Sequence, residues 1–176
     1  DCSVTPRVNW RFSPGDPAGQ GGSDYRHFPD AAYFIDPHNI ARAGNSTLLE
    51  VPMSIQYKHS GLMNSIKQGY DALRGKQRSP SVHWLRPSGG NLATMKSVVE
   101  RTLAAGSDYV EFMLHSSEFM PGGSPTFKNQ EEIEGLYRDL DALFSWLSER
   151  TRGMTLAEYY DVTLAKRASG SKAAAN

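Results

Sequence analysis

The sequence has one cysteine, no long apolar run and no excess of charge of either sign. Cys2 therefore has no partner within the chain for a disulfide, and no Cys/His cluster predicts a zinc finger. The 19 basic residues balance the 19 acidic ones, which leaves no net field to attract a nucleic acid or an anionic membrane. No stretch approaches the roughly 18 apolar residues that a membrane-spanning helix needs. We therefore expect a soluble chain with no nucleic-acid partner and no membrane span.

The length and the composition predict a single domain. A chain of 176 residues with 39% hydrophobic residues can bury a substantial core. We expect this domain to span residues 1–168 and to be followed by a disordered tail over residues 169–176 (SGSKAAAN). Because the chain begins at Asp1 and its first methionine is Met53, we interpret the sequence as a fragment whose start lies upstream.

Apolar periodicity predicts strands that alternate with helices. Runs rich in β-branched and aromatic residues predict strands at residues 32–35, 48–55, 82–85 and 109–114. Helical spacing of apolar residues predicts helices at residues 62–73, 92–103 and 133–147 and from Thr155 onward, and a Gly/Pro-rich stretch predicts a long loop at residues 11–29. We expect Asn91 to be the N-cap of the second of these helices, and the pairs Asn129–Glu132 and Thr155–Glu158 resemble capping boxes at the starts of the last two. This order is typical of an α/β protein with parallel strands, whose chemistry gathers at the carboxyl ends of the strands. The loops at residues 86–91 and 115–128 are therefore the candidate site.

His115 follows directly on the predicted strand at residues 109–114. A side chain at that position stands on a rigid base, and an imidazole exchanges protons near neutral pH. Ser116 and Glu118 come next, in a loop that contains a Pro-Gly-Gly turn, and we expect both to contact the substrate. The alternative is a histidine that is hydrogen bonded within its own loop.

Trp84 and Arg86 lie at the end of the predicted strand at residues 82–85. An indole packs on the apolar face of a sugar ring, and a guanidinium donates to hydroxyl or carboxylate groups, so we expect these residues to bind a carbohydrate. An equally good alternative places Trp84 in the core and pairs Arg86 with a nearby acidic residue.

The five histidines form no H-x-x-x-H or H-E-x-x-H motif, so no metal site is predicted within the chain. The Gly-rich run at residues 15–22 lacks the spacing of a phosphate-binding loop. Ser116 lies in no G-x-S-x-G elbow, which disfavours a serine hydrolase.

Four segments together resemble one known family. They are residues 1–6 (DCSVTP), 48–54 (LLEVPMS), 84–88 (WLRPS) and 110–118 (VEFMLHSSE). In this order they are similar to the C-terminal part of polysaccharide deacetylase-like proteins of the NodB-homology superfamily, and more narrowly to a bacterial subgroup found near cell-surface polysaccharide genes. The likeness extends to about Leu147, and the H-S-S-E-F-M-P-G-G-S-P loop is its most specific part.

The resemblance implies the C-terminal half of an irregular β/α barrel, incomplete at its N-terminus. Members of the family remove N-acetyl or O-acetyl groups from sugars with a divalent metal, usually zinc. Their Asp-Asp and H-x-x-x-H motifs, which supply the base and the metal ligands, have no counterpart in this sequence. Zinc is therefore expected in the full-length parent and not in this fragment.

The family's late L-x-H motif matches residues 113–115, with Met in place of the usual Leu. The match implies that His115 is the general acid that protonates the leaving amine. The Asp that orients this histidine matches Asp1. Arg86 follows Asp1, whereas the family's arginine motif precedes this Asp, so Arg86 is not given that motif's role.

These observations predict part of a carbohydrate deacetylase-type hydrolase in a bacterial cytoplasm or cell envelope, with the fragment alone inactive. A non-catalytic sugar-binding remnant and an accessory protein of polysaccharide synthesis are the alternatives. We expect strands near Val4, Val51, Val82 and Phe112 to lie side by side, with the loops that carry Arg86 and His115 at one edge.

Overall fold

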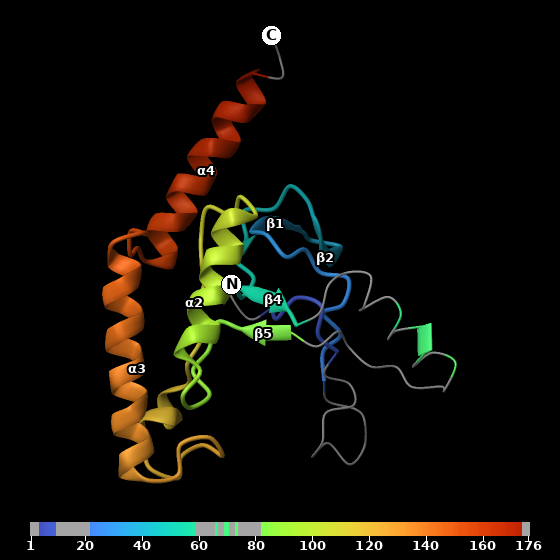
Figure 1. Ribbon diagram of the computed structural model, residues 1–176. Helices are drawn as coiled ribbons and strands as arrows, with labels where there is room; N and C mark the ends of the chain where they lie inside the picture. Colours follow the sequence, from blue (N-terminus) through green and yellow to red (C-terminus); the bar gives the residue numbers. More distant parts are fainter. Residues whose placement is uncertain are drawn as a thin grey trace. The chain divides into compact units, whose positions relative to one another are not determined.

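The structure, a computed structural model, describes residues 4–9, 22–58 and 82–173 and the isolated positions Ile66, Gly69, Tyr70 and Leu73 (Figure 1). The chain divides into two compact units, residues 1–140 and 141–176. Asp1 and most of the loop predicted at residues 11–29 lie outside the described residues. Of the helix predicted at residues 62–73, only the four isolated positions are described, and all four are helical.

The first unit contains a three-stranded sheet in the order β2-β1-β3. The strand β1 (Tyr33–Asp36) pairs with β2 (Asn39–Ala43) on one edge and with β3 (Leu49–Glu50) on the other. The turn between β1 and β2 is closed by the Asp36 carboxylate, which accepts the His38 N–H at 2.8 Å. The predicted strand at residues 32–35 is therefore confirmed as β1.

A second, two-stranded sheet pairs β4 (Ile55–Tyr57) with β5 (Val82–Trp84). The strand predicted at residues 48–55 is divided between β3 and β4, which corrects the prediction. Pro52 interrupts the run because it has no N–H to donate, and the Met53 N–H leaves the sheet to donate to the Val4 carbonyl at 3.0 Å.

All strand pairs among the described residues are antiparallel, whereas the strand-helix alternation predicted parallel strands. For β1 and β2 the physical reason is the two-residue turn between them, which returns the chain antiparallel, whereas a parallel pair needs a crossover of a dozen or more residues. The connection between β4 and β5 is long enough for a parallel pair, so its length does not account for their antiparallel pairing. No closed barrel is present in the part of the chain that the structure describes.

Residues 109–114 form no strand, which corrects a second prediction. The Ser54 N–H donates to the Glu111 carbonyl at 3.4 Å, and the Met113 N–H donates to the Leu85 carbonyl at 3.2 Å. The Glu111 N–H, however, donates to the Ser54 hydroxyl at 2.9 Å. A side chain thus takes the place of a backbone partner, and the ladder is interrupted.

These bonds join the segments that we expected to be neighbours. Met53 is bonded to Val4, the Leu85 N–H donates to the Ser54 carbonyl at 3.1 Å, and Met113 is bonded to Leu85. Val4, the stretch before β4, the end of β5 and residues 111–113 therefore lie side by side. Their adjacency agrees with the prediction, but Val4 and residues 111–113 do not form the strands that it expected.

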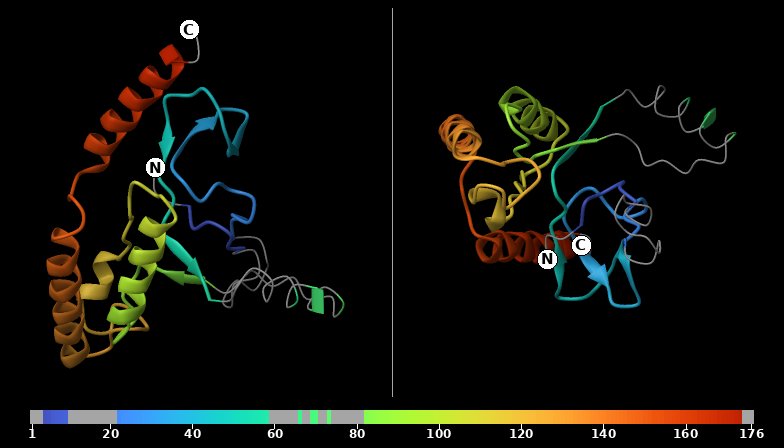
Figure 2. Two further views of the ribbon diagram at one scale, coloured as in Figure 1. Left: turned by 45° about the horizontal axis from the view of Figure 1, so that its top comes forward. Right: turned by 90° about the horizontal axis from the view of Figure 1, so that it is seen from below.

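The helix α2 (Leu92–Ala104) confirms the predicted helix and lies against β4 and β5 (Figures 1 and 2). It ends where Gly106 adopts a φ of 88°, which favours glycine. The Gly106 N–H donates to the Leu103 carbonyl at 2.9 Å, and the Ser107 N–H donates to the Thr102 carbonyl at 3.2 Å. This pair of bonds is a Schellman motif, which satisfies the last carbonyls of the helix. The helix buries Met95, Val98 and Val99.

The short 3-10 helix η1 (Ser116–Phe119) precedes the long helix α3 (Gln130–Ser148). Asn129 accepts the Glu132 N–H at 3.0 Å with its side-chain oxygen, as predicted for the residue that caps α3. Within the first unit, apolar residues of this region pack into one cluster, namely Phe127, Ile133, Leu136 and Leu140 with Phe112 and Leu114 against it.

The second unit consists of the last part of α3 and of α4 (Leu156–Ala173). The predicted capping box is confirmed: the Thr155 hydroxyl accepts the Glu158 N–H at 3.2 Å, and the Glu158 carboxylate accepts the Thr155 N–H at 2.7 Å. The helix α4 continues to Ala173, beyond the Ser169 start of the predicted tail. Among the residues of this unit that the structure describes, Leu143, Leu147 and Tyr159 are buried.

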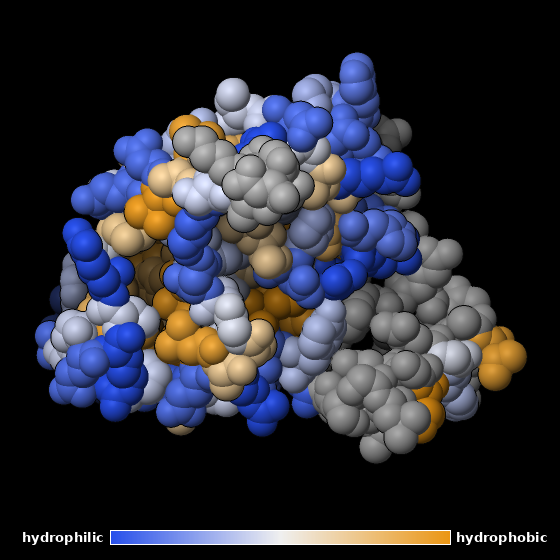
Figure 3. Space-filling model, turned by 90° about the horizontal axis from the view of Figure 1, so that it is seen from above, coloured by the Kyte–Doolittle hydropathy of each residue, from blue (hydrophilic) through white to orange (hydrophobic). Residues whose placement is uncertain are grey.

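Polar side chains predominate on the face shown in Figure 3, and apolar ones lie between them in separate patches. None of the helices in the described residues combines the length and the apolar character needed to cross a bilayer.

Candidate functional site

The predicted site begins where β5 ends. Leu85 is fully buried, and Arg86 follows it at the start of a loop that leads to α2. Asn91 closes this loop, because its side chain donates to the Arg86 carbonyl at 2.9 Å and accepts the Ser88 N–H at 2.8 Å. We predicted Asn91 as the N-cap of α2; it occupies that position, but its side chain binds the loop and not the helix.

Glu118 connects this loop to His115. Its Oε1 accepts the Arg86 Nη2–H at 2.8 Å, and its Oε2 accepts the His115 backbone N–H at 3.0 Å. The Glu118 N–H in turn donates to the His115 carbonyl at 3.0 Å. The Glu118 side chain is only 1% exposed, and that of Arg86 is 25% exposed. A buried carboxylate with a guanidinium partner therefore holds the two predicted loops at one edge.

The loop after η1 is closed by its own hydrogen bonds. The Gly122 N–H donates to the Phe127 carbonyl at 3.0 Å, and the Gly123 N–H donates to the Met120 carbonyl at 2.8 Å. The Ser124 hydroxyl accepts the Phe127 N–H at 3.1 Å. A Cβ on Gly123 would lie 2.2 Å from the Ser117 carbonyl oxygen, so this close approach requires glycine.

The structure places the predicted site residues in different environments. His115 and Ser116 are exposed, Trp84 is partly buried, and Asp1 lies outside the described residues. The backbone of His115 is fixed by Glu118 on one side and by residues 109–114 on the other. Arg86 pairs with an acidic residue, which is the alternative that the sequence left open. Glu118 is engaged through both carboxylate oxygens, so it positions the loops.

Two further carboxylates, the buried Glu50 and the partly buried Glu111, were missed by the sequence analysis. Glu50 is 5% exposed, and its Oε1 accepts the Val4 N–H at 3.2 Å. Burial raises the pKa of Glu50. The pKa of Glu111 is raised to about 7, first by burial and then by the nearby charge of Glu50. The sequence did contain a signal for these two residues, because each glutamate interrupts an apolar run (LLEVPM and YVEFML).

Burial raises the pKa of Tyr33 to about 12, with a further contribution from Glu50. The Glu111 Oε2 is buried and has no hydrogen-bond partner among the described residues. This region therefore favours protonated, neutral side chains.

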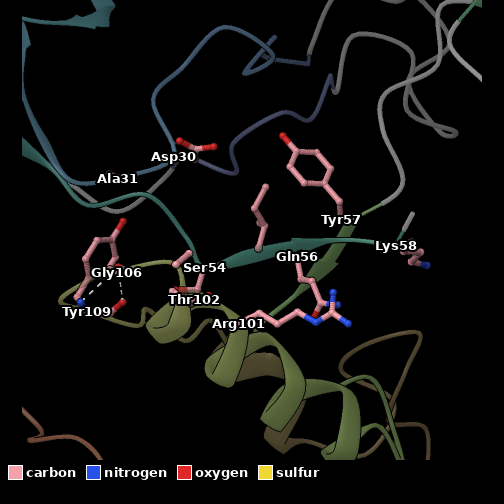
Figure 4. Close-up of a pocket in the computed structure, with 13 residues that line it drawn as sticks. Asp30, Ala31, Ser54, Gln56, Tyr57, Lys58, Arg101, Thr102, Gly106 and Tyr109 are labelled. Carbon is pink, nitrogen blue, oxygen red and sulfur yellow. Dashed lines mark hydrogen bonds between the residues drawn. The ribbon is translucent and has the colours of Figure 1, made fainter. Parts of the chain in front are cut away.

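A cavity of about 770 Å³ opens beside β4 (Figure 4). Four parts of the chain line it: Asp30 and Ala31, Ser54 to Lys58, Arg101 with Thr102, and the residues Ala105, Gly106, Ser107 and Tyr109. The sequence analysis missed this site, because no local motif reports that four separate segments converge.

The described residues contain no group of three or more His, Cys, Asp or Glu side chains placed to hold a metal ion. We therefore assign no metal ligand to these residues. Comparison of the chain with protein-family models, with curated proteins and with solved structures finds no match.

Proposed function

We propose that this chain is the C-terminal part of a carbohydrate deacetylase-type hydrolase that acts on sugars of a cell-surface polysaccharide. The observation that supports this proposal best is the link through Glu118, which brings the loops of Arg86 and His115 to one edge. The proposed reaction is inferred from the sequence resemblance, and the proposed position of the site is inferred from the link through Glu118.

In the proposed reaction, water adds to the acetyl carbonyl, the C–N bond breaks, and the amine leaves with a proton. His115 donates that proton. Its exposed ring stands on a backbone that Glu118 holds in place, and a positioned general acid accelerates such a step by about 10²–10⁴-fold. Asp1 is proposed to orient the ring.

Trp84 and Arg86 are proposed to bind the sugar, together with the hydroxyl of Ser116. Trp84 is partly buried, which leaves part of its indole for contact with a sugar ring. Arg86 is 25% exposed and has further N–H donors beyond the Nη2 that binds Glu118.

The described residues do not fit a zinc site, so no step of the reaction is assigned to a metal bound by them. The Asp-Asp and H-x-x-x-H motifs are proposed to lie upstream in the full-length parent, where zinc would polarise the carbonyl and activate the water.

The test is His115→Ala in the full-length parent, assayed by acetate release from an acetylated amino sugar. We expect turnover to fall by at least about 10²-fold with the zinc content unchanged. Asp1→Asn should give a smaller loss. His38→Ala is the matched control, because His38 is also an exposed histidine of the first unit but lies in the β1–β2 turn.

Loss of zinc from His115→Ala would make His115 a metal ligand, and unchanged turnover would make it a structural loop residue. A parent that binds the sugar but releases no acetate would support the alternative, a non-catalytic sugar-binding protein.

A further inference from the structure

We propose that the cavity beside β4 binds a carboxylated sugar unit of an acidic polysaccharide, with Arg101 receiving the carboxylate. The carbohydrate class rests on the proposed function, whereas the preference for a negative charge comes from the cavity itself. The cavity volume of about 770 Å³ lies within the usual range for ligand sites.

The cavity is distinct from the edge that carries His115. Tyr57 pairs with Val82 at the beginning of β5, whereas Arg86 follows the end of β5. The helix α2 begins just after the Arg86 loop, and its last turn, which contains Arg101, borders the cavity. About 14 Å of helix separates Leu92 from Arg101. A polymer could therefore occupy both places, whereas a single sugar could not.

The charges that line the cavity are predominantly positive. Arg101 and Lys58 are both exposed, and neither forms an ion pair with a carboxylate in the described part of the chain. Asp30, the acidic residue of the lining, is already paired with Arg7 at 3.2 Å. The two cations are thus uncompensated, and a ligand with a negative charge fits them.

The arrangement of donors fits the hydroxyl and carboxylate groups of a sugar acid. Gln56 and Arg101 lie on one side of β4, and Tyr57 and Asp30 lie on the other (Figure 4). The Gln56 Oε1 accepts the Ser97 hydroxyl at 3.4 Å, which directs its carbonyl toward α2 and leaves its amide N–H groups as donors. A planar guanidinium binds a carboxylate through two parallel hydrogen bonds.

Tyr57 adds an aromatic ring to this polar lining. The residue is 37% exposed and belongs to β4, which has β5 on one edge and no strand on its other edge among the described residues. A ring of this kind packs on the apolar face of a sugar. Because Tyr57 lies on the other side of β4 from Arg101, it would contact a neighbouring unit of the polymer and not the unit whose carboxylate Arg101 binds. The polar donors, and the two cations that have no carboxylate partner among the described residues, fit an acidic sugar better than an uncharged one.

The test measures binding of α-1,4-linked trigalacturonate to the 176-residue chain by isothermal titration calorimetry. The comparison ligand is the same trisaccharide with its carboxyl groups reduced, and we expect it to bind at least about tenfold more weakly. Arg101→Gln should lower the affinity for trigalacturonate by at least about tenfold, and Arg101→Lys should lower it less. Raising the salt from about 0.05 M to about 0.5 M should weaken the binding.

Two matched controls separate this site from others. Arg152→Gln removes an exposed arginine of the second unit and should leave the affinity unchanged. His38→Ala, in the exposed turn between β1 and β2, should also leave it unchanged. The test measures binding and not acetate release, so the failure of the proposed catalysis and the failure of this inference are distinguishable.

Equal affinity for the charged and the reduced trisaccharide, or full affinity in Arg101→Gln, would overturn the proposal. Two further probes test the class of ligand. If inorganic phosphate binds the chain as tightly as trigalacturonate does, the cavity is a general anion site. If tetraglutamate binds as tightly as trigalacturonate does, the cavity recognises an acidic peptide. Either result would contradict a sugar site.

Discussion

Glu111 and Glu50 are carboxylates whose pKa values are raised by burial. Glu50 has a backbone partner in the Val4 N–H, whereas the Glu111 Oε2 has none among the described residues. A buried carboxyl group is more stable when it is protonated, because it then carries no charge. The folded chain therefore holds these protons at pH values where the unfolded chain has released them, and the stability of the first unit depends on pH.

We predict that the free energy of unfolding falls as the pH rises from about 4.5 to about 7. In that window the unfolded chain releases the Glu111 proton, while the folded chain keeps it. Because part of the side chain faces solvent, we expect a loss of only about 1–2 kcal/mol. Urea denaturation across this range measures the effect.

Glu111→Gln should remove most of this pH dependence, because an amide stays neutral throughout. Glu100→Gln, at an exposed position of α2, is the matched control and should leave it in place. If the free energy of unfolding of Glu111→Gln still falls with pH as in the unchanged protein, another titrating group causes the effect.

A second prediction concerns the pair of Arg86 and Glu118. Arg86→Met leaves the Glu118 carboxylate buried without its cation, so we expect a loss of stability of about 3 kcal/mol, the lower end of the range for buried pairs because Arg86 is 25% exposed. Arg150→Met is the matched control: Arg150 pairs with Glu149 at 2.9 Å, but these side chains are 42% and 72% exposed. That variant should lose less than about 1 kcal/mol. Similar losses in the two variants, measured by denaturation, would contradict a structural role for Glu118.

At the scale of elements, the loop between η1 and α3 depends on the close approach of Gly123 to the Ser117 carbonyl oxygen. Gly123→Ala would place a Cβ against the Ser117 carbonyl, so we predict a loss of stability of about 1–3 kcal/mol in thermal or urea unfolding. Gly153→Ala is the matched control, because nothing lies within 4 Å of a Cβ there. An unfolding midpoint for Gly123→Ala equal to that of Gly153→Ala would show that the loop is not held as described.

The helices were predictable because their signals are local. The apolar stripe of α3, the capping residue Asn129 and the Thr155–Glu158 box all lie within a few positions of the backbone groups that they affect. Local sequence is sufficient for such elements, and their predicted positions agree with the structure to within a few residues.

The strands were less predictable because their partners are distant in sequence. Nothing near Glu111 indicates that its N–H will bind the hydroxyl of Ser54, which ends the expected strand. Arg86 and Glu118 are likewise 32 positions apart, so the sequence pointed to both loops but not to the ion pair that joins them. The cavity beside β4 had no sequence signal at all.

At the scale of the whole molecule, the 176 residues lack the H-x-x-x-H motif of a zinc site. We predict that the chain alone retains no stoichiometric zinc after dialysis at neutral pH. Elemental analysis of the dialysed protein checks this. One zinc ion per chain after dialysis would mean that the five histidines contain a site without a recognised motif.

The boundary between the two compact units falls after Leu140, inside α3 and not in a linker. Anyone who trims the gene at that boundary would cut a continuous helix in the middle and leave its last carbonyl groups without partners. The stretch between α3 and α4, around Gly153, is a better place to shorten the protein for expression or to attach a fusion partner, because no helical hydrogen bonds cross it.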